Sequence, residues 1–211
     1  EQARARIAAR EPNAELTVQV CDVGELADVR RFCAGFTARV PALDLLVHNA
    51  GLMPPERIET SEGNEVTLAV HVLGPHLMTA LLADALRAGA ARRDAGDAGH
   101  TDSRVLIVAS GGMYAQPLKV DDLQYRQGSY GGTAAYARTK RMQVVLAGLW
   151  ARELAGTGVT VHALHPGWAA TPGISGSLPG FDRLVGPLLR TPEQGADTAV
   201  WLAAAPSSAV G

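Results

Sequence analysis

Hydrophobic and polar residues alternate along this chain with two periods, one typical of strands and one typical of helices. Short apolar runs predict strands over residues 16–20, 43–47, 104–109 and 160–164. Longer stretches with apolar residues three or four apart predict helices over residues 1–10, 25–39, 61–87, 133–155 and 193–204. Ser61 is the expected N-cap of the third helix, and Gly156 is the expected C-cap of the fourth. Loops are predicted over residues 88–103, 111–132 and 165–190.

The alternation of strands and helices indicates an α/β fold with a parallel sheet and right-handed crossovers. A length of 211 residues suits a single domain, and no repeat or linker divides residues 1–211. In such sheets ligands bind where the strands end on their carboxyl side. Ser110 and residues 49–51 and 166–167 all follow predicted strands, so we expect them at one edge of the sheet.

Composition favours small-molecule chemistry. The chain is 47% hydrophobic, its net charge is −2 and its pI is about 6.3, which gives no reason to expect a nucleic-acid partner. Cys21 and Cys33 have neither the spacing of a metal site nor that of a disulfide framework, so they are interpreted as packing residues in a reducing compartment. No secretory or lipidation motif is found, and we expect a cytoplasmic protein.

Residues 66–83 contain no Asp, Glu, Lys or Arg, and these 18 residues reach the length of a membrane span. However, the stretch contains His71, His76 and the pair Gly74-Pro75, and its large apolar residues follow helical spacing. This pattern favours a buried or subunit-facing helix over a membrane span.

Tyr136 and Lys140 are the first candidates for chemistry. In a helix they lie four residues apart on one face, where an ammonium would stabilise a phenolate. A phenol normally keeps its proton until about pH 10, so such a pair could exchange a proton with a substrate oxygen at lower pH. Ser110, 26 residues before Tyr136, would orient that oxygen for carbonyl reduction or alcohol oxidation. Alone, the spacing also fits a solvated pair on a helix surface.

Several separated motifs occur in a defined order: His48-Asn-Ala-Gly51, Ser110, Tyr136-Ala-Arg-Thr-Lys140 and His165-Pro-Gly167. With them the chain resembles the short-chain dehydrogenase/reductase family over essentially all of residues 1–211. The resemblance implies a Rossmann-type doubly wound parallel sheet and an oxidoreductase that uses NAD or NADP on a small-molecule substrate.

The resemblance also implies a role for each matching residue. Tyr136 would be the general acid/base, Ser110 would hydrogen-bond the substrate oxygen, and Lys140 would hold the nicotinamide ribose. The positions that match the family's cofactor-binding segments, besides Tyr136 and Lys140, are Asp22 and Val23 near the adenine, Asn49, Ala50 and Gly51 near its ribose, and Pro166, Gly167 and Thr171 near the nicotinamide. Taken singly, these are common turn and cap residues.

His71 departs from the family pattern, which has an asparagine here whose backbone carbonyl holds a water in a proton relay to the lysine. Pro75 lies four residues later and has no N–H, so we expect the carbonyl of His71 to lack its helical partner and to remain available for that water. The alternative is that His71 is a packing residue only.

The family's glycine-rich phosphate-binding turn and the strand after it are absent from this sequence. In the doubly wound order 3-2-1-4-5-6, residues 16–20 would then be an isolated third strand. We expect a chain truncated at both ends and inactive alone. The alternative is a non-catalytic binding or scaffold protein.

Residues 111–145 and 165–173 further resemble the branch of dehydrogenase/reductase member twelve, close to the retinol-dehydrogenase-like enzymes. Residues 172–189 include Ile174, Leu178, Phe181, Leu184, Val185 and Leu188 among prolines and glycines, which suggests a mobile lid over a lipophilic substrate. An amphipathic helix packed on the core fits this segment as well. Many family members pair through the two long helices, so a homodimer is a further expectation.

Overall fold

A parallel three-stranded sheet forms the centre of the structure. The computed structural model describes residues 2–93, 102–169 and 189–210. The strands are β1 (Leu45–His48), β2 (Ser103–Val108) and β3 (Val159–Leu164), adjacent in that order. They run parallel, with His48 beside Ile107 and Val108 beside Leu164, so all three end at the same edge. The predicted α/β fold with a parallel sheet is confirmed.

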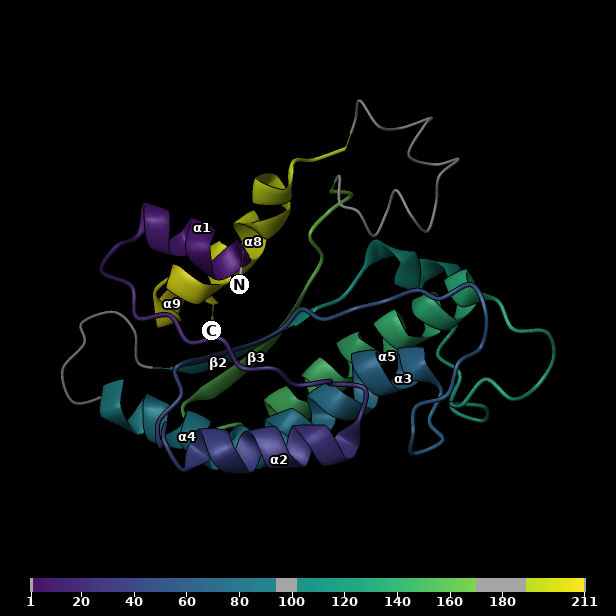
Figure 1. Ribbon diagram of the computed structural model, residues 1–211, viewed down its shortest axis with the longest axis horizontal. Coiled ribbons are helices and arrows are strands. Elements are labelled where there is room, and N and C mark those ends of the chain that lie inside the picture. The colour runs from purple at the N-terminus through teal and green to yellow at the C-terminus, as the bar shows by residue number, and fades with distance from the viewer. Residues whose placement is uncertain (1, 94–101, 170–188, 211) are drawn as a thin grey trace.

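Helices cover both faces of this sheet (Figure 1). One face carries α2 (Leu26–Thr37), α4 (Gly74–Arg93) and α5 (Gly132–Glu153). The other face carries α8 (Pro192–Ala204) and α9 (Ser207–Val210), with α1 (Gln2–Arg10) beside α8. This two-sided covering is that of a doubly wound sheet, as expected.

Side chains of β2 alternate between two apolar cores. Val105 and Ile107 pack with Leu86 of α4 on one face, and Leu106 packs with Leu202 of α8 on the other. Both faces of β2 are therefore covered by apolar side chains, which explains why its sequence is a continuous apolar run rather than an alternating one.

A third cluster joins α2 to α4 and contains both cysteines. Cys33 is buried against Met78 and Leu82, and Cys21 packs against the same group. Burial raises the pKa of the Cys33 thiol to about 11. Both thiols are free, and their packing role is confirmed.

Residues 16–20, predicted as a strand, form none, and this prediction was wrong. Within the described residues the sheet has three strands, and no strand lies beside this segment to take its backbone N–H and C=O groups. Val20 is 92% exposed. The apolar alternation is present, but an isolated strand in water has no partner to stabilise it.

The helix predicted over residues 61–87 is displaced. It begins with α3 (Val66–Leu68), continues through a π-helical turn (Ala69–Leu73) and then runs as α4 to Arg93, six residues into the predicted loop. The π-helical turn precedes Pro75, which has no N–H to continue the α-helical ladder, and Gly74 N donates instead to Ala69 O, five residues back.

Glu65, not Ser61, is the N-cap of this helix. The Glu65 carboxylate accepts hydrogen bonds from the backbone N–H of Thr67 at 2.9 Å and of Leu68 at 2.7 Å. Ser61 is engaged elsewhere, because its backbone N–H donates to Glu25 at 2.9 Å. The prediction of a Ser61 cap was therefore wrong.

Among the described residues, one helical stretch, Val66–Arg92, is long and apolar enough to cross a membrane. Core helices of globular proteins pass the same test, and 67% of this stretch's most apolar window is buried inside the protein. It packs against α2, the sheet and α5.

Candidate active site

The carboxyl ends of the three strands bring the expected site residues to one edge. β1 leads into Asn49, Ala50 and Gly51, which are exposed, while β2 leads to Ser110 and β3 to the Pro166-Gly167 turn. Since the strands are parallel and in register, these segments lie along the same border of the sheet. An exposed strip of main chain there leaves room for a ligand.

Ser110 and Tyr136 face the same small space. Ser110 is the N-cap of a 3-10 helix (Gly111–Ala115), and its Oγ accepts a hydrogen bond from Gly112 N at 3.1 Å. That contact uses an oxygen lone pair, so the hydroxyl hydrogen can still point to a substrate oxygen. A Cβ at Gly112 would lie 3.4 Å from Ser110 Oγ and 3.7 Å from Tyr136 Cε1. The serine and the tyrosine therefore flank one glycine.

Lys140 is the buried member of the group. It lies one turn after Tyr136 on α5 and is 4% exposed, with Nζ 5.5 Å from the centroid of the Tyr136 ring. Its Nζ donates to Val108 O at 2.7 Å, two residues before Ser110. Burial lowers the pKa of Lys140 to about 8, so the ammonium form still predominates at neutral pH.

Gly51 covers this ammonium. A Cβ at position 51 would come to 3.9 Å from Lys140 Nζ and to 3.2 Å from His71 Nε2. The missing side chain leaves a cradle above the lysine, open to the exposed strip of residues 49–51. A hydroxyl-rich ligand lying on Gly51 would be within reach of the ammonium.

The sequence of this chain is similar to those of several known proteins. The model for short chain dehydrogenases matches residues 1–100. Dehydrogenase/reductase SDR family member 12 of Bos taurus is 36% identical over 208 residues, which are 99% of this chain and 61% of that protein. The chain is thus similar to the short-chain dehydrogenase/reductase family, as its motifs predict. It thus spans about three fifths of the length of this relative.

Other similar proteins agree with this comparison. Retinol dehydrogenase 14 of Homo sapiens is 34% identical over 200 residues, covering 91% of this chain and 55% of that protein. The crystal structure of 3-ketoacyl-(acyl-carrier-protein) reductase from Brucella melitensis, complexed with NADH, is 25% identical with a TM-score of 0.66, covering 95% of this chain and 75% of that one. The resemblance to the member twelve branch and to retinol dehydrogenases is confirmed.

Asp22 and Val23, the expected adenine contacts, precede α2 and lie against the long helix, the name used here for α3, the π-helical turn and α4 together. The Asp22 carboxylate accepts from Gly24 N at 2.9 Å, and a Cβ at Gly24 would be 3.1 Å from Val70 Cγ2. The carbonyl of Val23 occupies the place that a Cβ at Gly74 would need. These contacts hold the segment against Val70, the residue that precedes His71 on the long helix.

The segment after β3 is held by Arg190. Gly167 has φ +78°, and a Cβ there would lie 2.9 Å from Arg190 Cδ. Arg190 N donates to Trp168 O at 2.7 Å. Thr171 and the predicted lid, apart from its last residue at 189, lie outside the described residues.

His165 was missed as a site residue. Its Nδ1 accepts a hydrogen bond from Gly111 N at 3.1 Å, next to Ser110, and burial with the nearby Arg190 lowers the pKa of this histidine. The ring therefore supports the turn that carries the serine. Its place in the His165-Pro-Gly167 motif was the available signal.

His48 stands where this family usually has the first asparagine of Asn-Asn-Ala-Gly. It is buried, its Nε2 lies 2.9 Å from Thr79 Oγ1, and burial lowers its pKa to about 4. Since Thr79 Oγ1 donates to Pro75 O at 2.8 Å, the neutral ring of His48 donates from Nε2. His48 thus fastens the end of β1 to α4.

The carbonyl of His71, expected to lack its helical partner because of Pro75, accepts a hydrogen bond from another helix. The side-chain amide of Gln143 on α5 donates to His71 O at 2.9 Å and fills the position that Pro75 leaves vacant. Two helices that are distant in sequence cross here, and a local pattern does not reveal which side chain fills the gap.

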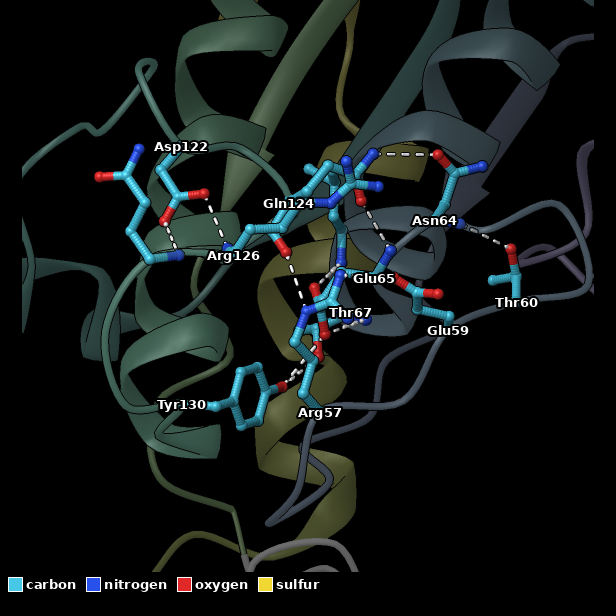
Figure 2. Close-up of polar contacts among 12 residues, drawn as sticks. Arg57, Glu59, Thr60, Asn64, Glu65, Thr67, Asp122, Gln124, Arg126 and Tyr130 are labelled. Atoms are coloured by element: carbon cyan, nitrogen blue, oxygen red, sulfur yellow. Dashed lines mark hydrogen bonds and ion pairs between the residues drawn. The ribbon is translucent and has the colours of Figure 1, made fainter.

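A partly buried cluster of polar side chains fastens residues 116–131 beside the site, as Figure 2 shows. Gln124 Oε1 accepts from Glu65 N at 2.7 Å, and Gln124 Nε2 donates to Asn64 Oδ1 at 3.0 Å. Tyr130 OH donates to Glu65 Oε1 at 3.1 Å, and Arg57 Nε donates to Gln124 O at 3.2 Å. The segment between the serine and the tyrosine is therefore fixed to the start of α3.

Proposed function

We propose that this chain carries the proton-handling site of an NAD(P)-dependent oxidoreductase that interconverts a carbonyl and an alcohol. The observation that supports it most is the placement of Ser110 Oγ and the Tyr136 ring on two sides of Gly112, with the Lys140 ammonium buried beside the tyrosine ring. A hydrogen-bond donor, a phenol and a cation then converge at the edge where ligands bind parallel sheets.

In the reducing direction, Ser110 donates a hydrogen bond to the carbonyl oxygen, and Tyr136 gives that oxygen its proton as the alcohol forms. A nicotinamide held at this site would supply or accept the hydride at the carbon. Lys140, held by Val108 O, stabilises the phenolate that Tyr136 becomes. In the oxidising direction the same groups act in reverse.

The residues of this chain fit a nicotinamide ribose. Gly51 leaves the cradle over Lys140, and Asn49 and Ala50 are exposed beside it. Lys140 would hold the ribose hydroxyls, and Pro166 and Gly167 would line the nicotinamide together with Thr171. Asp22 and Val23 would contact the adenine. The cofactor is NAD or NADP, in line with the NADH-complexed reductase that this fold resembles.

The proposed substrate is a lipophilic aldehyde, ketone or alcohol. The similarity to proteins named retinol dehydrogenases supports it, as does the apolar composition of residues 172–189.

We also propose a cytoplasmic homodimer. Leu81 on α4 and Leu149 on α5 are 39% and 46% exposed, and α4 and α5 touch through the rings of His76 and Trp150 at 5.3 Å.

Replacing the phenol tests the proposal. Tyr136→Phe keeps the ring and removes the acidic hydroxyl, so turnover should fall by about 10²- to 10⁴-fold while the thermal unfolding midpoint is retained. The assay uses a series of aliphatic aldehydes with NADH or NADPH, on this chain and on the gene product extended upstream. A Tyr136→Phe protein as active as its parent would refute the assignment.

A further inference from the structure

His71 lies at the centre of contacts that the proposed mechanism does not use. The ring is fully buried and makes a T-shaped contact with the Tyr136 ring, with 5.4 Å between centroids and 83° between planes. Leu52 N donates to His71 Nε2 at 3.1 Å. His71 Nδ1 lies 2.8 Å from Thr139 Oγ1, the residue between the tyrosine and the lysine that faces the long helix.

These contacts define the tautomer of the ring. A backbone N–H can only donate, so Nε2 is the bare nitrogen and a neutral ring must carry its hydrogen on Nδ1. Nδ1 then donates a hydrogen bond to Thr139 Oγ1. The threonine hydroxyl in turn donates to the carbonyl of Tyr136 at 3.0 Å or of Ala135 at 3.1 Å. An unbroken chain of hydrogen bonds runs from the loop after β1 to the backbone of Tyr136.

The main chain of His71 is held by the same helix. Gln143, one turn after Thr139 on α5, donates its amide to His71 O at 2.9 Å. Thr139 and Gln143 thus grip the ring and the carbonyl of one residue, and both side chains are buried. A phenylalanine of similar size could fill the space but would make none of the ring's hydrogen bonds.

We propose that His71 is a positioning residue of the Ser110-Tyr136-Lys140 site. Its ring links the Leu52 backbone to Thr139 and so fixes the gap between the Gly51 cradle and the helical turn that carries Tyr136 and Lys140. This inference rests on the proposed function, since it concerns the geometry of that site.

The ring must stay neutral for this role. A second proton would face the Leu52 N–H, so the hydrogen bond there would be lost. Burial, assisted by the positive charge of Lys140, lowers the pKa of His71 well below its ordinary value. Lys140 and Tyr136 on α5 are the ionisable groups beside the ring, whereas residues 49–52 carry none. With His71 neutral, Lys140 is the positively charged side chain at the Gly51 cradle.

The test removes one oxygen from the link. Thr139→Val keeps the shape of the side chain and deletes the acceptor, whereas Thr139→Ser keeps the hydroxyl. Nitrogen-15 NMR of the histidine rings and carbon-13 NMR of the lysine Cε are followed from pH 5 to 11 on this chain. The parent and Thr139→Ser should show His71 protonated at Nδ1, bare at Nε2 and not titrating.

In Thr139→Val the Nδ1–H loses its partner, so water enters or the ring turns, and the midpoint of Lys140 should rise by about one pH unit toward its ordinary value. A role in packing alone would leave that midpoint unchanged. The inference fails if His71 titrates near pH 6.5 or carries its hydrogen on Nε2, or if Lys140 is unaffected. If Thr139→Val does not fold, the titration midpoint of Lys140 is measured in His71→Phe instead. The same rise is expected there, and an unchanged midpoint refutes the inference.

Catalysis separates this inference from the proposed function. In whichever form of the protein turns over, Thr139→Val should lower kcat about tenfold with a small change in the nicotinamide KM, and Thr139→Ser should restore it. Turnover that survives Tyr136→Phe refutes the function and leaves the NMR result standing. Loss with Tyr136→Phe but none with Thr139→Val refutes the inference alone.

Discussion

Lys140 shows how a single residue links burial to chemistry. Only 4% of the residue is exposed, and its ammonium donates a hydrogen bond to the carbonyl of Val108. Burial without an opposite charge disfavours the ammonium, so keeping a cation beside Tyr136 lowers the free energy of unfolding. The energetic consequence can be measured without any substrate.

Lys140 should make the stability of the fold depend on pH. Its pKa falls from 10.5 to about 8 on folding, so between these values the unfolded chain binds more protons and stability rises with pH. Lys140→Met removes this contribution. Urea unfolding at pH 7 to 10.5 should show the parent gaining up to about 3 kcal/mol relative to Lys140→Met. Parallel curves for the two proteins would contradict the burial of a charged lysine.

The sequence predicted the reacting residues better than the residues that hold them. Ser110, Tyr136 and Lys140 carry a signature in spacing and position after strands, and the structure brings them together. The partners of His71 carry none, because Thr139 and Gln143 meet it only where α5 crosses the long helix. Contacts between distant segments are decided by packing, which a local pattern does not contain.

Glu65 is the corresponding case at the scale of elements. Serine is a common N-cap, so Ser61 was the natural prediction from local sequence. The structure instead uses a carboxylate that is 1% exposed and accepts from two backbone N–H groups and from Tyr130 OH. One buried side chain therefore begins the long helix and anchors the segment between Ser110 and Tyr136 (Figure 2).

Glu65→Ala should lower the free energy of unfolding by about 2 kcal/mol, because two buried N–H groups lose their acceptor. Glu56→Ala, at an exposed position nine residues earlier, is the matched control and should change stability by less than about 0.5 kcal/mol. Urea denaturation measures both. Equal stability of the two variants would mean that the carboxylate does not cap the helix.

At the scale of the whole molecule, a buried ion pair joins the C-terminal helices to the sheet. Asp102 accepts from Arg104 Nε at 2.8 Å and from Thr160 Oγ1 at 2.8 Å, and it also bonds Ser207 of α9. Arg104 reaches the carbonyl of Leu202 on α8. The pair lies at the opposite end of the strands from Ser110, so it supports the sheet without entering the site.

Asp102→Asn should destabilise the protein by about 3–5 kcal/mol at pH 7, because Arg104 would be left as a buried charge without its partner. Burial alone would raise the pKa of Asp102, but hydrogen bonds from Arg104, Ser207 and Thr160 outweigh it and hold the pKa well below its usual range. The carboxylate's contribution is therefore fully present above about pH 4 and is lost as pH falls toward the lower folded value.

The difference in unfolding free energy between the parent and Asp102→Asn should accordingly be constant from pH 7 to pH 5 and shrink below about pH 4. Asp121→Asn, at an exposed position, is the control and should follow the parent throughout. Chemical denaturation at pH 7, 5 and 3 decides the question. A difference that stays the same between pH 5 and pH 3 would show that folding does not lower the pKa of Asp102, and the ion pair would then not join the C-terminal helices to the sheet.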